Sequence, residues 1–250
     1  MSGHSKWANI KHKKGRADAK RGKVFTQISK EITIAAREGI GDPDFNPRLR
    51  LAVQNAKAVN MPNENIKRAI QKGTGEIEGI VYEEAIYEGY APLGVAVILE
   101  VVTDNKKRTV AELRSQFGKL GGSLGEPGSV AWNFDRKGVV TINSSNEKEE
   151  DLFDLVIEAG AEDLDFGEET SRIICPYETL NLCSKYLEDK KKEITQSKLE
   201  FIPKNIVNID NIDDARRLLK FIDTFEEHED VQYVYSNFEI DDSIVDALEE

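Results

Sequence analysis

The spacing of apolar residues in the first third of the chain predicts helices. From residue 24 to residue 75, apolar side chains recur at steps of three and four, which places them on one face of an α-helix. Three short helices around a small core are predicted, with breaks at 39–43 and 61–63. The second helix should start at Asn46-Pro47, because asparagine caps helix N-termini and proline suits the first helical position.

The pattern changes at about residue 80, where strands begin to alternate with helices. Strands are predicted at 82–90 and 95–103, which are rich in β-branched and aromatic residues. Thr109 and Glu112 have the spacing of a capping box and should open a helix that ends at Leu120. This part therefore starts as a β-β-α set.

A second mixed segment has the element order β-α-β-β-α-β, which is that of a ferredoxin-like domain. Four residues of its first helix are predicted to face inward, namely Leu152, Phe153, Val156 and Ile157. The predicted elements are a strand at 139–142, a helix at 148–159, hairpin strands at 162–166 and 170–175, a helix at 177–191 and a strand at 194–202.

The elements on the two sides of this segment complement each other. Residues 80–134 end with an incomplete β-β-α set, and a helix and a strand after Pro203 would complete it. We therefore expect an α+β fold with an N-terminal three-helix domain and two α/β domains, one ferredoxin-like and inserted in the other. The predicted divisions are a flexible basic arm at 1–23, a helical domain at 24–78, a middle α/β domain at 79–134 plus 205–240, and the inserted domain at 135–204. The last ten residues are expected to form an acidic tail or a short helix.

Charge is distributed unevenly over the 250 residues. Residues 1–78 hold 16 lysines and arginines against 8 aspartates and glutamates, whereas residues 79–250 hold 18 against 38. The net charge of −12 therefore combines a basic end of +8 with an acidic body of −20. A basic module on an acidic body is typical of proteins that bind a polyanion through one end only.

Composition narrows the class of protein further. No apolar stretch approaches the ~20 residues of a membrane-spanning helix, and the basic N-terminus lacks the apolar segment of a secretory signal. Two cysteines, Cys175 and Cys183, are too few for a secreted disulfide scaffold. We expect a cytoplasmic protein with two reduced thiols and no membrane partner.

Signatures of catalysis and of cofactor or metal binding are weak. The glycine-rich segment GKLGGSLGEPG (118–128) lacks the spacing of phosphate-binding and dinucleotide-binding loops, so it is interpreted as a flexible turn. His4 and His12 have no acidic or cysteine partner in the arm. His228 lies in the acidic stretch EEHED and is interpreted as a solvated surface residue, with a metal site there as the alternative. The sequence thus predicts no enzyme, no cofactor and no metal site, with an unrecognised catalytic site in a cleft as a remote alternative.

Three clusters of cations favour nucleic-acid binding. The arm has eight cations within 23 residues and includes Trp7, which could stack on an unpaired base. Cations on the second and third helices would extend this surface, and a triplet at 106–108 is expected in the turn before a helix N-terminus. The predicted contact residues are Lys6, Trp7, Lys11, His12, Lys13, Lys14, Arg16, Lys20, Arg21, Lys23, Lys57, Lys67, Arg68, Lys106, Lys107 and Arg108.

Each cluster has a simpler interpretation that stays open. The arm could bind any polyanion loosely, the helix cations could be ordinary solubilising charge, and the triplet could be a solvated loop. The acidic domains are a possible contact for a protein partner, on charge alone.

Four blocks of the chain resemble the YebC/PmpR family. They are MSGHSKWANIKHKKGRADAKRGKVF (1–25), NMPNENIKRAI (60–70), YEGYAPLGVAVILEVVTDN (87–105) and LGGSLGEPGSVAWNFDRKG (120–138). The usual family pattern has a second glycine where Leu93 stands and another residue in place of Asn133. The resemblance implies a helical N-terminal domain and two α/β domains, one inserted in the other.

The resemblance also implies a role in gene expression and leaves two hypotheses. Members are generally described as probable DNA-binding transcriptional regulators. Others, including a mitochondrial translational activator of a cytochrome oxidase subunit, are linked to translation, which would make ribosomal RNA the partner. No helix-turn-helix with base-reading side chains is evident from the sequence, and a flexible basic arm suits structured RNA.

Overall fold

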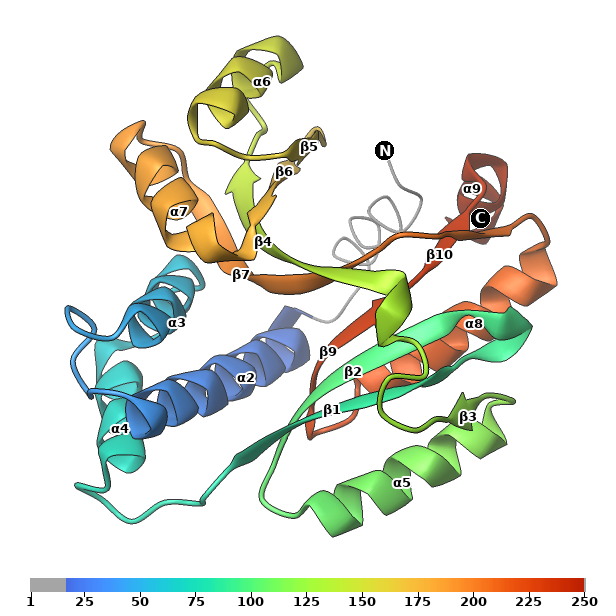
Figure 1. Cartoon of the computed structure of the whole chain (residues 1–250), viewed down its shortest axis with the longest axis horizontal. Helices are drawn as coiled ribbons and strands as arrows, with labels where there is room; N and C mark the ends of the chain where they lie inside the picture. Colours follow the sequence, from blue (N-terminus) through green and yellow to red (C-terminus); the bar gives the residue numbers. More distant parts are fainter. Residues whose placement is uncertain (1–16, 250) are drawn as a thin grey trace. The chain divides into compact units, whose positions relative to one another are not determined.

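Three helices at the start of the computed structural model form a bundle with its own core (Figure 1). The structure describes residues 17–249. The helices are α2 (Ala17–Glu38), α3 (Pro47–Ala58) and α4 (Asn63–Thr74). Buried residues from all three, such as Ile32, Leu49 and Ile66, form the core. The predicted amphipathic periodicity therefore corresponds to a packed bundle.

The start of α3 is as predicted from Asn46-Pro47. The Asn46 side-chain oxygen accepts a hydrogen bond from the Leu49 N–H at 3.1 Å, and Pro47 is the first helical residue. The Asn46 amide also donates to the carbonyl oxygens of Ala35 and Ile40 at 2.7 and 2.9 Å. The capping residue therefore also fixes the end of the preceding helix.

The first helix begins earlier than predicted. α2 starts at Ala17, so the last seven residues of the predicted flexible arm, 17–23, are helical, and that boundary is wrong. Good helix formers such as alanine, lysine and arginine dominate there, and they outweigh the single Gly22. The rest of the arm, residues 1–16, lies outside the described residues.

Segments on both sides of the insertion build one four-stranded sheet, in the order β3-β1-β2-β9. β2 pairs antiparallel with both β1 and β9, so the expected completion of the set is observed. The strands and helices are β1 (Glu83–Tyr90), β2 (Ala96–Thr103), α5 (Lys106–Lys119), β3 (Ser123–Leu124), β8 (Val207–Ile209), α8 (Ile212–Glu226), β9 (Val231–Ser236), β10 (Phe238–Ile240) and α9 (Asp242–Glu249). The short parallel pair β8 and β10 was not predicted, and the last residues form a helix.

Aromatic residues of α5 and α8 form the centre of this core. The Phe117 ring lies 5.1 Å from that of Phe221 and 4.5 Å from that of Phe225, measured between ring centroids, and all three are fully buried. Such pairs contribute about 1 kcal/mol beyond the apolar area that they bury. Phe117 precedes the insertion and the other two follow it, so the core joins both flanks.

The inserted segment has the predicted ferredoxin-like order. Its sheet runs β5-β6-β4-β7, and β6 is antiparallel to both β4 and β5. The elements are β4 (Phe134–Asn143), α6 (Glu149–Glu158), β5 (Asp163–Asp165), β6 (Thr170–Pro176), α7 (Leu180–Asp189) and β7 (Ile194–Pro203). The α+β fold class is therefore confirmed. Both cysteines are buried and free, as expected for reduced thiols.

Contacts divide the described chain into two compact units. One comprises residues 17–80 and 136–200, and the other 81–135 and 201–249. The second unit is thus discontinuous in sequence. The finer domain boundaries given above stay predictions.

Two local predictions fail for identifiable reasons. In α6, Leu152 and Val156 are buried as expected, but Phe153 and Ile157 are 55% and 60% exposed. The buried face of α6 is therefore narrower than the apolar stripe in its sequence suggests. At α5, Asn105 is the N-cap, because its side-chain oxygen accepts from the Arg108 N–H at 3.1 Å, whereas Thr109 is buried inside the helix.

The turn from β1 to β2 contains a leucine in a left-handed conformation. Leu93 has φ 66° and ψ 15°, a region that costs an L-residue about 1–2 kcal/mol. Its side chain is 44% exposed, so little apolar burial offsets that cost. The glycine that is usual at this position in the resembling family has no such cost.

We expect Leu93→Gly to raise the free energy of unfolding by about 1 kcal/mol, because glycine adopts this conformation without strain. Urea unfolding measures the change. The matched control is Gly94→Ala, since Gly94 has φ +73° and nothing within 4 Å of the place that a Cβ atom would take, so only strain is added. The control should lower stability by a similar amount. A less stable Leu93→Gly variant would contradict the assignment of strain.

Candidate nucleic-acid interface

Cations gather on the exposed side of α4. Ile66, Ala69 and Gly73 face the bundle, while Lys67 and Arg68 are exposed. Gly73 lies so close to α2 that a side chain would clash with the Thr33 carbonyl oxygen. The close contact fixes which face of α4 meets solvent. The predicted exposure of Lys67 and Arg68 is therefore observed, and Lys72 and Lys57 of the bundle are exposed too.

Most of the predicted arm contacts cannot be placed. Lys20, Arg21 and Lys23 belong to the first turns of α2, and Lys23 is half-buried. Lys6, Trp7, Lys11, His12, Lys13, Lys14 and Arg16 lie outside the described residues.

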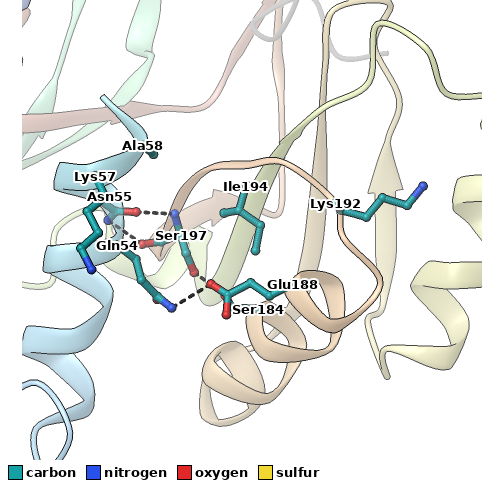
Figure 2. A pocket seen from close by; sticks show the side chains of 9 residues that line it. All are labelled: Gln54, Asn55, Lys57, Ala58, Ser184, Glu188, Lys192, Ile194 and Ser197. Carbon is teal, nitrogen blue, oxygen red and sulfur yellow. Dashed lines mark hydrogen bonds between the residues drawn. The ribbon is translucent and has the colours of Figure 1, made fainter. Parts of the chain in front are cut away.

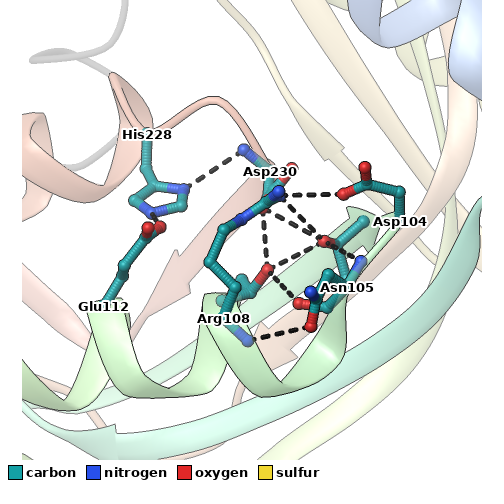
Figure 3. A network of polar contacts seen from close by, with 8 residues as sticks. Asp104, Asn105, Arg108, Glu112, His228 and Asp230 are labelled. Atoms are coloured by element: carbon teal, nitrogen blue, oxygen red, sulfur yellow. Dashed lines mark hydrogen bonds and ion pairs between the residues drawn. The ribbon is translucent and has the colours of Figure 1, made fainter.

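The cationic triplet forms the first turn of α5 and not the turn before it. Lys106 pairs with Glu83 at 2.8 Å. Arg108 donates to Asp230 at 2.8 Å and pairs with Asp104 at 2.9 Å (Figure 3). Arg108 therefore has two acidic partners within its own unit, and Lys107 is exposed.

Asp230 is the centre of a buried polar network at this end of the sheet. The side chain of Asp230 is 7% exposed, and its Oδ2 accepts from the Thr109 hydroxyl at 2.7 Å and from the Thr103 hydroxyl at 3.1 Å (Figure 3). A carboxylate with these partners and Arg108 is fully compensated. The network thus joins the end of β2, the start of α5 and the residue before β9.

The environment of His228 differs from the expected solvated surface. Its side chain is 8% exposed, its Nδ1 accepts from the Asp230 N–H at 3.1 Å, and its Nε2 lies 3.3 Å from a carboxylate oxygen of Glu112. The prediction is wrong because the partner, Glu112, is more than a hundred residues away in sequence. His228 helps to fix the loop before β9. Among residues 17–249, no group of three or more histidine, cysteine or acidic side chains could hold a metal ion.

A feature that the sequence analysis missed is the clamp formed by Glu88. This residue is 7% exposed, although it lies on β1. One carboxylate oxygen accepts from the Gly128 N–H at 2.7 Å, and the other accepts from Val130 and Ala131 at 2.8 Å each. The glycine-rich segment is thus tied to the sheet, which corrects its interpretation as a flexible turn. No local signal in the sequence marks this clamp, because its three donors follow Glu88 by about forty residues.

The clamp positions an exposed aromatic side chain. Trp132 is 63% exposed, and its indole N–H donates to the carbonyl oxygen of Ser129 at 3.0 Å. The Tyr90 hydroxyl donates to that same oxygen at 3.0 Å. The segment is therefore held by side chains of β1 while the indole ring faces solvent.

Hydrogen bonding lowers the pKa of Glu88. Burial alone would raise the pKa, but the three backbone N–H donors outweigh it. A carboxylate whose pKa is lower in the folded state stabilises the fold above its unfolded pKa of about 4.3, and that contribution is lost as the pH falls below this value.

We expect Glu88→Gln to lower the free energy of unfolding by about 2–3 kcal/mol at pH 7, since the amide group cannot accept all three N–H bonds. The deficit relative to the natural protein should begin to shrink as the pH falls below about 4.3, the unfolded pKa of glutamate, and should disappear as the pH passes the lower folded pKa of Glu88. Urea unfolding at a series of pH values measures this difference. Glu126→Gln is the control, because Glu126 is exposed in the same loop. A deficit that stays constant with pH would refute the clamp.

A polar pocket of about 320 Å³ lies within the first unit, between α3 and the α7–β7 region (Figure 2). Asn55 and Ser197 exchange two hydrogen bonds of 2.9 Å, and the Gln54 amide donates to Glu188 at 2.8 Å. Lys57 also lines the pocket. Most polar groups of the pocket bind one another, and these hydrogen bonds connect the bundle to the inserted segment.

Family models match both parts of the chain. The N-terminal domain of the TACO1/YebC protein matches residues 5–76, and its second and third domains match residues 82–238. No helix within the described residues is long and apolar enough to cross a membrane.

Relatives with similar sequences have a regulatory name. A "Probable transcriptional regulatory protein" from Dictyoglomus turgidum is 52% identical over 99% of this chain and 100% of its own length. A protein of the same name from Thermotoga maritima is 52% identical over 99% of this chain and 98% of its own. The crystal structure of a conserved hypothetical protein from Aquifex aeolicus superimposes with a TM-score of 0.86 at 44% identity, covering 91% of this chain and 93% of that one.

Proposed function

The chain belongs to the TACO1/YebC family, and from this premise we propose that it is a DNA-binding regulator of transcription. The names of its relatives support a regulatory role. The observation that carries nucleic-acid binding is the segregation of charge, with +8 in residues 1–78 and −20 in the remainder. The acidic body repels phosphate and so restricts contact to the basic end.

The exposed face of α4 is the part of this end best suited to a groove. Asn65 and Arg68 are both exposed and lie three residues apart, on one side of the helix. Asparagine and arginine are the residue types that pair with adenine and guanine edges in the major groove. Lys67 and Lys72 beside them would contact phosphates.

A second candidate function is that of a ribosome-associated translation factor. It is favoured by the composition of residues 1–23, which hold eight lysines and arginines, three glycines and a single tryptophan. A segment of this type suits the irregular surface and unpaired bases of structured RNA. The two functions share the basic end and differ in the nucleic acid that it contacts.

We expect replacement of Lys11, Lys13 and Lys14 by glutamine to weaken binding about equally for all nucleic-acid sequences. Each phosphate contact that is lost reduces the slope of log affinity against log salt by about 0.7–0.9, so the slope should fall by about 2–3. Fluorescence anisotropy with a labelled oligonucleotide at several salt concentrations measures both. The control with the same charge change replaces the exposed Lys119, Lys185 and Lys220. Equal affinity and slope in both triple variants would refute the proposed contact.

Sedimentation of the protein from cell lysate through a sucrose gradient separates the two functions. For a transcriptional regulator, we expect the protein to stay at the top of the gradient with or without RNase. Comigration with ribosomal particles that RNase abolishes would instead establish the translational function, because RNA would then be the binding partner. A genome-wide DNA crosslinking map is the companion measurement, and a map without enriched sites would contradict the transcriptional function.

A further inference from the structure

The outer face of α6 carries apolar side chains that the inserted segment does not bury. Leu152 and Val156 pack into the core of this segment, whereas Phe153 and Ile157 are 55% and 60% exposed. The two exposed residues lie four positions apart, so they share one side of the helix (Figure 1). A patch of neighbouring apolar groups is a mark of contact sites, unlike apolar residues that are scattered singly.

The neighbouring helix α7 adds to the apolar exposure on this side of the segment. The Tyr186 hydroxyl donates to the carboxylate of Glu158, so α7 lies beside α6. One turn before Tyr186, Leu182 is 69% exposed. A ligand of the α6 face is therefore expected to bring apolar groups of its own, because burial of apolar surface on both partners favours association.

The charge around the patch determines which kind of ligand it suits. Residues 147–169 hold eleven aspartates and glutamates against the single Lys148. On α6, Glu150 and Asp154 are exposed and precede Phe153 and Ile157 by three residues each, which places them on the same side of the helix. The face thus combines apolar contact with negative potential. It repels phosphate and attracts a basic segment that contains apolar residues.

The chain itself contains a segment of this chemistry at residues 1–16, here called the N-terminal segment, which lies outside the described residues. It has five lysines and arginines, no acidic residue, and the apolar Trp7 and Ile10 among the cations. It continues into α2, which belongs to the same compact unit as α6. The ten residues from Trp7 to Ala17 can span about 33 Å, which is most of the width, about 35 Å, of a compact unit of this size.

We propose that the N-terminal segment docks on this face of α6 when no nucleic acid is bound, with Trp7 and Ile10 against Phe153 and Ile157. The inference rests on the proposed function, because docking withholds cations that nucleic acid would contact. A tethered segment has an effective concentration on the order of 1 mM, so a weak contact is sufficient. Nucleic acid competes with the acidic face for the same cations, and its apparent affinity falls in proportion to the undocked fraction.

The emission of Trp7 measures docking without any nucleic acid. In a Trp132→Phe variant, Trp7 is the only tryptophan of the chain. Adding Phe153→Ser and Ile157→Ser should shift this emission to longer wavelength and increase its quenching by acrylamide, because the indole loses an apolar contact and enters water. Both replaced side chains are more than half exposed, and circular dichroism checks that the fold is retained.

Affinity for an oligonucleotide is the second measurement. If half or more of the molecules are docked, the serine variant should bind a labelled oligonucleotide at least about twofold more tightly than the natural protein. Glu150→Gln with Asp154→Asn should have the same two effects, since it removes the charge that attracts the segment. The control with the same charge change is Glu126→Gln with Glu227→Gln, both exposed in the other unit, and it should leave the emission of Trp7 unchanged.

The outcomes separate the inference from the proposed function. Equal Trp7 emission in the natural, serine and amide faces would refute docking, whether or not oligonucleotides bind. Unchanged emission together with binding of an unrelated basic, amphipathic peptide to the natural face would refute it in favour of a protein partner. Emission that depends on protein concentration would refute the intramolecular contact in favour of docking between two copies. If emission responds as expected but no oligonucleotide binds, docking is supported and the proposed function fails.

Discussion

The pairing of β2 with β9 is the constraint on which the second unit depends. The two strands come from opposite sides of the insertion, and Val97 pairs with Ser236 in the register between them. The sheet and the Phe117–Phe221 core form only when these flanks meet. The network at Asp230 reinforces the contact, since its carboxylate accepts from Thr103 and Thr109, which lie 127 and 121 residues away. Non-local closure of this kind is slow to form and is stabilised mainly by what it buries.

Local patterns were enough to predict most elements, and long-range partners account for the failures. Asn46-Pro47 fixes a helix start through bonds within its own turn, so sequence alone predicts it. Thr109 has equally good local spacing, but Asp230 binds its hydroxyl, and Asn105 caps the helix instead. The Nε2 atom of His228 lies 3.3 Å from a carboxylate oxygen of Glu112, a contact that no window of the sequence contains. Tertiary context overrides local propensity at such positions.

Predictions about the site also succeed where the signal is local and fail where the partners are distant in sequence. The exposure of Lys67 and Arg68 on α4 could be predicted, because the amphipathic spacing of this helix separates them from its buried face. The Glu88 clamp could not, since a glutamate in a strand is usually solvent-facing and its three donors come from a loop about forty residues later. Without the clamp, Trp132 is only one aromatic residue in a glycine-rich stretch. The fold therefore determines which aromatic side chains are available to a ligand.

The ends of the insertion meet within hydrogen-bond distance. Asn133 precedes the inserted sheet and Asn205 follows it, yet their side chains and backbones bind each other, and the Lys204 N–H lies 2.8 Å from the Asn133 carbonyl oxygen. The host sheet thus requires only a closed junction, whatever the length of chain between its two ends. The segment between these ends is in this sense a cassette: a short turn that closes the same junction should leave the register of β2 and β9 unchanged.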